Sequence, residues 1–488
     1  MPLVLARLLT IVVALAAVGS TGVAASSSGT APLQTGLFDP ASFESNPALS
    51  FARTRAAGAG SARLILEWRA TVPRDVRPVG FDATNPNDPA YDWSSFDRQV
   101  RPALSAGLEP IAILFLAPRW AEGANGGSGI DRPDPDELGM FAQAAAKRYD
   151  GREGRPRVRH WQVWNEPNIS LYMTPQFVNG KPFSPGHYRK MVNAVAGAVK
   201  TVRADNLVVA GGTAPFRDIT PEVVKINPRW GPLTFMREFL CLSRALKPTC
   251  SEKVRFDAWA HHPYTSGGPT HHAVLPDDVS LGDLPEMRKV LDAGSRTRHI
   301  TSRGPVRFWV TEFGWDTKGP DPRGVPLALH ARWVSEGLYR MWKSGVSLVT
   351  WFQVRDDSLK DTFYQSGLWF RGATPAADRP KPALRAFRFP VVAIPESRGV
   401  RVWGRTPFGR AGRLVVEQSS RGRWKVLGRL SADRNGIFER VFATSPVGSV
   451  RARLSSGELS IPFAVPPVRD QAFNPFGQET LLEPKRKR

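Results

Sequence analysis

Residues 184–210 read SPGHYRKMVNAVAGAVKTVRADNLVVA and place a helix directly before a strand. Apolar side chains recur at three- and four-residue intervals from Tyr188 to Val202, which is the spacing of a helix that buries one face. The apolar, β-branched run at 207–210 is typical of a buried strand. A helix that packs back onto the next strand is the repeating step of a parallel sheet, so this stretch predicts an α/β fold.

Short apolar runs of the same kind recur on both sides of this unit. Together with 207–210 they give eight predicted strands, and eight βα repeats over about 350 residues predict a (β/α)₈ barrel, the TIM-barrel fold, across residues 34–390. The alternative, a doubly wound sheet, requires a glycine-rich phosphate-binding turn after the first strand, and Phe38-Asp39-Pro40-Ala41 is not such a turn. The other predicted strands are 35–38, 62–68, 110–115, 160–163, 256–260, 306–311 and 347–352.

The pattern changes after the barrel. Residues 396–465 contain short alternating strands at nearly regular spacing, separated by Gly, Asn and Ser turns, and this predicts a small antiparallel β-sandwich. Residues 466–488 are rich in proline and end in Lys485-Arg486-Lys487-Arg488, so we expect a basic, disordered tail.

The N-terminus has the features of a secretory signal. Arg7 precedes an apolar run at 8–18, and small residues lead to Ala25, which predicts a signal peptide over residues 1–25. An uncleaved membrane anchor is the alternative, although the apolar run is short for a membrane span. After cleavage we expect no transmembrane segment and an extracellular or cell-wall location. In that compartment Cys241 and Cys250, which lack the CxxC spacing of metal or redox sites, are predicted to form a disulfide.

The composition indicates a folded protein with a strong positive charge. The 488 residues are 42% hydrophobic, which a disordered chain is not, and the formal net charge is +22. Residues 391–488 hold 18 Lys and Arg against 8 Asp and Glu, so the basic excess is concentrated there. No nucleic-acid-binding motif accompanies the charge. We therefore expect the basic C-terminal domain to contact an anionic cell envelope or an acidic polysaccharide, and expect no nucleic-acid partner.

Two predicted strands each end in a glutamate. Glu166 follows the fourth strand in Trp164-Asn165-Glu166-Pro167, and Glu312 follows the seventh in Thr311-Glu312-Phe313-Gly314. An ionised carboxylate is disfavoured inside a buried strand, so a glutamate at its tip is expected to face a cleft. In a (β/α)₈ barrel these tips meet at the catalytic face, and glycoside hydrolysis needs such a pair of carboxylates.

The two segments that carry these glutamates resemble the acid/base and nucleophile signatures of clan A of the glycoside hydrolases, which are retaining (β/α)₈ enzymes that need no cofactor. The resemblance spans most of residues 34–385. Within the clan, 163–168 and 117–121 resemble family 39, whose members act on β-xylosides and uronides, whereas 311–315 resembles family 5 and the cellulase-like group. The resemblance therefore implies a secreted hydrolase acting on a poly- or oligosaccharide, with the sugar left open.

The resemblance also implies roles for single residues. Glu166 would be the acid/base, Glu312 the nucleophile, and Asn165 would contact the sugar 2-hydroxyl. On the sixth strand, His262 would lie in the site and the Tyr264 hydroxyl would contact Glu312. Arg63 on the second strand would hold the nucleophile, and Trp351 at the end of the eighth strand would form the floor of the sugar subsite.

Other side chains near strand ends have less specific interpretations. Trp120 and Trp315 are candidates for stacking on sugar rings, with packing as the alternative. Arg63 could instead pair with Glu67, and His262 could be an ordinary core histidine. A zinc site built from the residues His261, His262, His271 and His272 is a further alternative, which we disfavour because barrel metallohydrolases take ligands from several strands and the first strand offers none.

The sequence thus supports two functions of different kinds. The first is a retaining O-glycosidase with the pair of glutamates as its catalytic groups. The second is a catalytically inactive, glycan-binding protein of the cell envelope on the same barrel.

Overall fold

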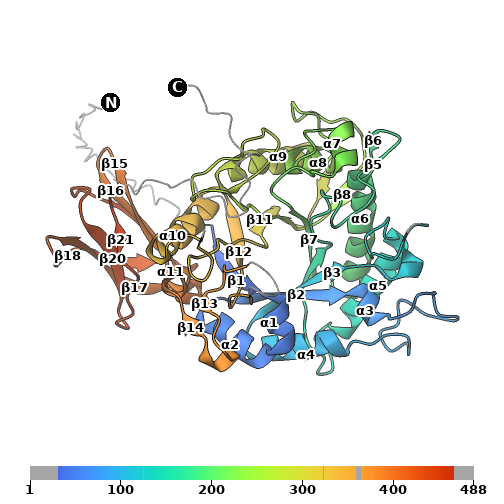
Figure 1. Cartoon of the computed structure of the whole chain (residues 1–488), viewed down its shortest axis with the longest axis horizontal. Coiled ribbons are helices and arrows are strands. Elements are labelled where there is room, and N and C mark those ends of the chain that lie inside the picture. Colours follow the sequence, from blue (N-terminus) through green and yellow to red (C-terminus); the bar gives the residue numbers. More distant parts are fainter. Residues whose placement is uncertain (1–30, 125, 323, 359–363, 467–488) are drawn as a thin grey trace, which may run out of the picture.

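A computed structural model of the chain describes residues 31–466 except 125, 323 and 359–363. Its centre is a closed barrel of eight parallel strands in the order β1-β12-β11-β9-β7-β4-β3-β2, surrounded by helices (Figure 1). The predicted (β/α)₈ fold is confirmed, and the bounds of the predicted strands all lie within three residues of those observed. The barrel strands are β1 Gln34–Phe38, β2 Ser61–Glu67, β3 Glu109–Phe115, β4 His160–Val163, β7 Leu207–Thr213, β9 Ala258–His261, β11 Arg307–Val310 and β12 Val346–Phe352.

Helices cover the outside of the barrel. The helix predicted from the opening stretch is α6, Ser184–Val202, which packs against α5, Pro135–Arg148. Asp134 caps α5 by accepting hydrogen bonds from the next backbone amides, and Pro135 occupies its first turn. The remaining helices are α1 Pro40–Ser45, α2 Pro47–Ala56, α3 Trp68–Thr71, α4 Ser94–Ser105, α7 Pro221–Ile226, α8 Pro232–Phe239, α9 Leu284–Arg296, α10 Leu327–Lys343 and α11 Pro382–Arg388.

The inside of the barrel is filled by side chains. A compact cluster contains Ile111, Val209, Ala258, Trp309 and Leu348, all at most 1% exposed. The Trp309 ring lies edge-on against His160, with 5.2 Å between their centroids. Because this packing closes the lumen, the open end of the barrel is left to the loops that follow the strands.

A β-sandwich follows α11. One sheet has the order β15-β16-β19 and the other β18-β17-β20-β21, all antiparallel, and both lie to one side of the barrel in Figure 1. The strands are β15 Val391–Glu396, β16 Gly399–Arg405, β17 Gly412–Ser420, β18 Arg423–Ala432, β19 Ile437–Phe442, β20 Ser449–Leu454 and β21 Phe463–Ala464. The sequence did not predict β15, which fills most of the interval that we left between the barrel and the sandwich.

The sandwich packs closely on the barrel. Trp403 of β16 is fully buried and lies 5.3 Å from the ring of Tyr339 on α10. The buried guanidinium of Arg405 donates to the backbone oxygen of Leu33, just before β1, at 2.6 Å. Strand β16 of the sandwich therefore contacts both α10 and the segment just before β1, and the two units share an apolar core.

The cysteine prediction is confirmed, because Cys241 and Cys250 form a disulfide in the connection between α8 and the short strand β8, Val254–Arg255. The predicted signal peptide, residues 1–25, and nearly all of the predicted tail lie outside the described residues. Within the described residues, no helix is both long enough and apolar enough to cross a bilayer.

Candidate active site

The structure brings Glu166 and Glu312 together at the open end of the barrel. Glu166 follows β4 and Glu312 follows β11, and their side chains are 12% and 17% exposed. Both face the imidazole of His262, whose Nδ1 lies 2.8 Å from Glu166 Oε1 and 3.9 Å from Glu312 Oε2. These two oxygens are therefore at most about 6.7 Å apart, so the two carboxyl groups lie close together on either side of one imidazole.

The guanidinium of Arg63 connects the two strand ends. Its side chain is fully buried, and Nη1 donates to Glu312 Oε2 at 2.9 Å while Nη2 donates to Asn165 Oδ1 at 2.8 Å. The third donor, Nε, reaches Gln162 Oε1 at 3.1 Å. A planar fork of donors is suited to this task, because it fixes three acceptors in one plane. The alternative in which Arg63 pairs with Glu67 is wrong, since Glu67 pairs with Arg69 at 2.6 Å.

Tyr264 contacts the carboxylate oxygen of Glu312 that Arg63 does not reach. Its hydroxyl donates to Glu312 Oε1 at 2.9 Å, so both carboxylate oxygens accept a hydrogen bond in the free protein. Burial and the neighbouring Glu312 carboxylate raise the pKa of Tyr264 well above its ordinary value, so that the phenol keeps its proton. Donors on both oxygens are the hydrogen-bond arrangement that a nucleophilic carboxylate uses, because both lone-pair regions are oriented by fixed partners.

Glu166 is in a different electrostatic state. Burial raises the pKa of Glu166 to about 8, and the positive charge of Arg63 opposes that shift only in part. At neutral pH the carboxyl group of Glu166 is thus protonated, as a general acid must be. Burial also lowers the pKa of His262 to about 3, so the imidazole between the two carboxyl groups is neutral.

The alternative of His262 as an ordinary core histidine is only half right. The side chain is fully buried, and Nε2 lies 3.1 Å from the hydroxyl of Thr311. The other nitrogen faces Glu166, so the residue contacts the acid directly. A ring held at both nitrogens cannot rotate freely, and it therefore fixes where the Glu166 carboxyl group lies.

The backbone that presents Glu166 is strained. Trp164 has φ of 65° and Glu166 has φ of 42°, and both values lie in the left-handed region that side chains other than glycine rarely adopt. The Trp164 indole donates to the backbone oxygen of Tyr172, and the Glu166 amide donates to the backbone oxygen of Gly212. Such strain persists only where the surroundings enforce it, and it is concentrated at functional sites.

Gly212 is required for this arrangement. Its φ is +62°, and a Cβ atom at this position would lie 2.6 Å from Nε2 of Gln162. Any side chain would therefore displace Gln162, which supports Arg63. The two consecutive glycines at the end of β7 thus have a definite role in the site.

Two of the three tryptophans predicted to contact sugar do not present a face to the site. Trp351 is 1% exposed and its indole donates to the backbone oxygen of Ser366, while Trp315 is 2% exposed and donates to Gly267. Both lie against Phe313, the residue after the nucleophile. We correct their role from stacking platforms to packing that supports Phe313.

Trp120 lies apart from this aromatic cluster. Its ring is partly exposed and meets the rings of Trp68 and Phe81 edge-on at 5.9 and 6.1 Å. No contact between Trp120 and the two glutamates is present among the described residues. A role for Trp120 in sugar binding stays a prediction.

The four histidines considered for a metal do not converge. His261 is buried, with its nitrogens 2.8 Å from Thr213 Oγ1 and from the backbone oxygen of Val279. His271 lies 3.0 Å from the Ser266 hydroxyl, and His272 pairs with Asp283 at 2.7 Å. Each imidazole therefore has its own partner, and only His262 faces the glutamates.

Sequence reasoning missed two residues that hold the others in place. Gln162 is an uncharged polar residue within the buried strand β4, four positions before Glu166, and it supports Arg63. Thr311 follows β11 directly, next to Glu312, and contacts His262. A buried polar side chain costs free energy unless it is paired, so a polar residue in such a strand was a signal that could have been used.

Three solved structures are similar to this chain. A family 39 glycoside hydrolase from the gut symbiont Bacteroides cellulosilyticus is 15% identical, with a TM-score of 0.51, over 88% of this chain and 81% of that chain. An enzyme of the same family from Xanthomonas axonopodis pv. citri is 15% identical, with a TM-score of 0.48, over 85% and 91%. A monomeric beta-xylosidase from Caulobacter crescentus is 15% identical, with a TM-score of 0.48, over 85% and 94%.

The first of these likenesses shows that the chain has the fold of a family 39 glycoside hydrolase. No protein-family model matches the sequence. No curated protein has a detectably similar sequence. At 15% identity this likeness shows a shared fold and no more.

The protonation state of Glu166 predicts an alkaline limit to activity. Because its pKa is raised to about 8, the acid is present below that pH and is lost as the pH rises through it, so kcat/KM should fall above pH 8. With Glu166→Gln we expect kcat/KM on substrates with poor leaving groups to drop by about 10²–10⁴, and the fall near pH 8 to disappear. Initial rates on aryl glycosides across pH 5–10 measure both effects. A fall in kcat/KM near pH 8 that persists in Glu166→Gln would contradict the assignment of this pKa to Glu166.

Proposed function

We propose that the protein is a retaining glycoside hydrolase that cleaves O-glycosidic bonds of a poly- or oligosaccharide. The observation that carries this proposal is the pair of carboxyl groups held close together in different surroundings. Glu166 is kept protonated by burial, whereas Glu312 accepts hydrogen bonds on both oxygens from Arg63 and Tyr264. This is the division of labour that double displacement at an anomeric carbon needs.

In the first step, an oxygen of Glu312 attacks the anomeric carbon and the bond from that carbon to the leaving oxygen breaks. Glu166 gives its proton to the leaving oxygen, so the aglycone departs as a neutral alcohol and a glycosyl ester remains on Glu312. Asn165, held by Arg63 at 2.8 Å, is placed to contact the sugar 2-hydroxyl.

In the second step, Glu166 is a carboxylate and removes a proton from water. The water oxygen bonds to the anomeric carbon, the ester bond breaks, and Glu312 returns as a carboxylate while Glu166 is protonated again. Two inversions at the same carbon give net retention. His262 remains neutral throughout, because the pKa of its buried imidazole is about 3, and it positions Glu166 without supplying a charge.

The specific setting of the reaction is also part of the proposal. The N-terminal sequence supports export of the enzyme, and the family resemblance supports a β-xyloside or uronide as the substrate. The alternative of an inactive glycan-binding protein on the same barrel is disfavoured, because the full set of Asn165, Glu166, Tyr264 and Glu312 is present.

Removal of either glutamate distinguishes catalysis from mere binding. Glu312→Ala should lower turnover by about 10⁴–10⁶, the scale on which loss of a nucleophile acts. Glu166→Ala should recover part of its lost activity on activated aryl glycosides when azide is added, because azide can occupy the space of the lost carboxyl group and needs no general base. The azide product should have the configuration of the substrate.

Glu286→Ala is a matched control, because this glutamate is 56% exposed on α9 and pairs only with Lys289 among the described residues. Its turnover should equal that of the parent protein. Circular dichroism and the thermal unfolding midpoint report whether each variant is folded. Full activity of folded Glu312→Ala would refute the proposal, as would sugar binding by the parent protein with no hydrolysis of any aryl glycoside or polysaccharide.

We also propose that the sandwich retains the enzyme on an anionic cell-wall polymer. The edge strand β18 carries Arg423, Lys425 and Arg429, which are exposed and form no ion pair with another described residue. By contrast, Arg451 and Arg453 on β20 are neutralised by Glu417. Unneutralised cations along one strand suit a surface that meets a polyanion.

Substitution of these three cations tests the retention. Arg423→Gln, Lys425→Gln and Arg429→Gln together should release the protein from isolated cell walls at a lower salt concentration, because the attraction is screened by ions. Hydrolysis of small aryl glycosides should be unchanged. An unaltered salt concentration for elution would refute the role of β18.

A further inference from the structure

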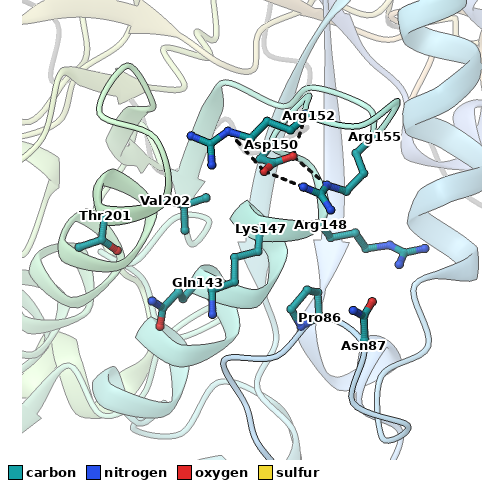
Figure 2. Close-up of a pocket in the computed structure, with 10 residues that line it drawn as sticks. All are labelled: Pro86, Asn87, Gln143, Lys147, Arg148, Asp150, Arg152, Arg155, Thr201 and Val202. Atoms are coloured by element: carbon teal, nitrogen blue, oxygen red, sulfur yellow. Dashed lines mark hydrogen bonds and ion pairs between the residues drawn. The ribbon is translucent and has the colours of Figure 1, made fainter.

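A second concave site lies at the opposite end of strand β4 from the catalytic glutamates. It is a groove of about 460 Å³, formed where α5 and α6 end and the chain turns back toward the starts of β4 and β7 (Figure 2). Its charged and hydrogen-bonding residues are Asn87, Gln143, Lys147, Arg148, Arg152 and Arg155, with one carboxylate, Asp150. A volume of this size is typical of sites for small ligands.

The groove has more positive charge than its own carboxylate neutralises. Asp150 accepts from Arg155 in a two-pronged pair at 2.9 and 3.1 Å and also lies 4.0 Å from Arg152 (Figure 2). Arg155 also pairs with Glu153 and Arg148 pairs with Asp97, so the four cations of the lining face three carboxylates. Lys147 donates to the backbone oxygen of Thr84 at 2.8 Å and forms no ion pair with another described residue. Arg152 and Lys147 therefore supply charge that a bound anion could use.

The surrounding sequence extends this positive region. Residues 147–159 contain six Lys and Arg against two Asp and Glu. Burial lowers the pKa of His160 to about 3, and the nearby charges of Arg159 and Arg157 add to that shift. Asp205 pairs with both Arg157 and Arg159 and offsets part of their charge, so the positive charge available to a ligand rests mainly on Lys147 and Arg152.

The character of the lining favours an acidic sugar over a nucleic acid. None of the described residues that line the groove has an aromatic ring, so it offers no surface on which bases could stack. The amides of Asn87 and Gln143 and the hydroxyl of Thr201 provide donors and acceptors of the kind that sugar hydroxyls use. Guanidinium groups match the planar geometry of a carboxylate.

We propose that this groove binds a uronic-acid-containing polysaccharide and anchors the enzyme on it. Arg152 and Lys147 pair with uronate carboxylates, while Asn87 and Gln143 bind hydroxyl groups of the same chain. The groove lies at the N-terminal end of β4 and the catalytic glutamates lie beyond its C-terminal end, so a segment held here is separate from the segment being cleaved. The anchoring site is distinct from the cations of the sandwich and does not depend on hydrolysis.

The test uses the full-length protein and an oligogalacturonate as the probe. Isothermal titration calorimetry at low salt is done on the Arg423→Gln/Lys425→Gln/Arg429→Gln variant, which lacks the cations of β18, and should still show binding. Adding Lys147→Gln and Arg152→Gln should weaken this binding about tenfold or more, since each residue supplies a charge-assisted hydrogen bond. Lys289→Gln combined with Arg296→Gln is the control, because it removes the same charge from α9, which does not line the groove. Ions in solution screen charges that far from the bound ligand, so this variant should change the affinity less than about twofold.

Further arms separate this proposal from its competitors. Binding should persist in Glu312→Gln, which separates anchoring from catalysis, and a neutral oligosaccharide of equal length should not bind at the groove. The unfolding midpoint and the rate on aryl glycosides should be unchanged in Lys147→Gln/Arg152→Gln. Equal loss of affinity in the groove variant and the α9 variant, no binding of oligogalacturonate by the parent protein, or tighter binding of duplex DNA that the groove variant abolishes would each overturn the proposal.

Discussion

The buried guanidinium of Arg63 is the constraint on which the site depends. It is a charge with no exposed surface, so it must be paired, and it can be paired only if the ends of β4 and β11 present acceptors at the right positions. Glu312, Asn165 and Gln162 provide those acceptors. Removing one partner of a buried ion pair typically costs about 3–5 kcal/mol, so the barrel register and the site geometry stabilise each other.

The two glutamates differ in their surroundings because only Glu312 pairs directly with the positive charge of Arg63. Glu312 pairs directly with Arg63 at 2.9 Å and also accepts from Tyr264. Glu166 faces a neutral imidazole instead, and burial raises its pKa to about 8. Two carboxyl groups around one histidine thereby have different electrostatic surroundings, which is what separate roles for a pair of carboxyl groups require.

The sequence predicted the parts of this arrangement that have a local signature. Each barrel strand has an apolar run of its own, and each glutamate interrupts such a run, so both features were visible in single segments. The burial of Trp351 and Trp315 was not visible, because it depends on Phe313 and on loops far away in the chain. The strand β15 was missed although it pairs locally with β16 in the same sheet, because Val391–Glu396 falls in the interval left between the two predicted domains. The groove beside α5 depends on helix ends that only the fold brings together.

The most direct test of the central claim is the configuration of the first-formed product. Proton NMR of a reaction on an aryl glycoside, recorded before mutarotation equilibrates the anomers, reports which anomer appears first. Glu312 as a nucleophile held by Arg63 and Tyr264, with Glu166 as the acid, predicts that the configuration of the substrate is retained. First appearance of the inverted anomer would show that Glu312 activates water instead, and would contradict the account.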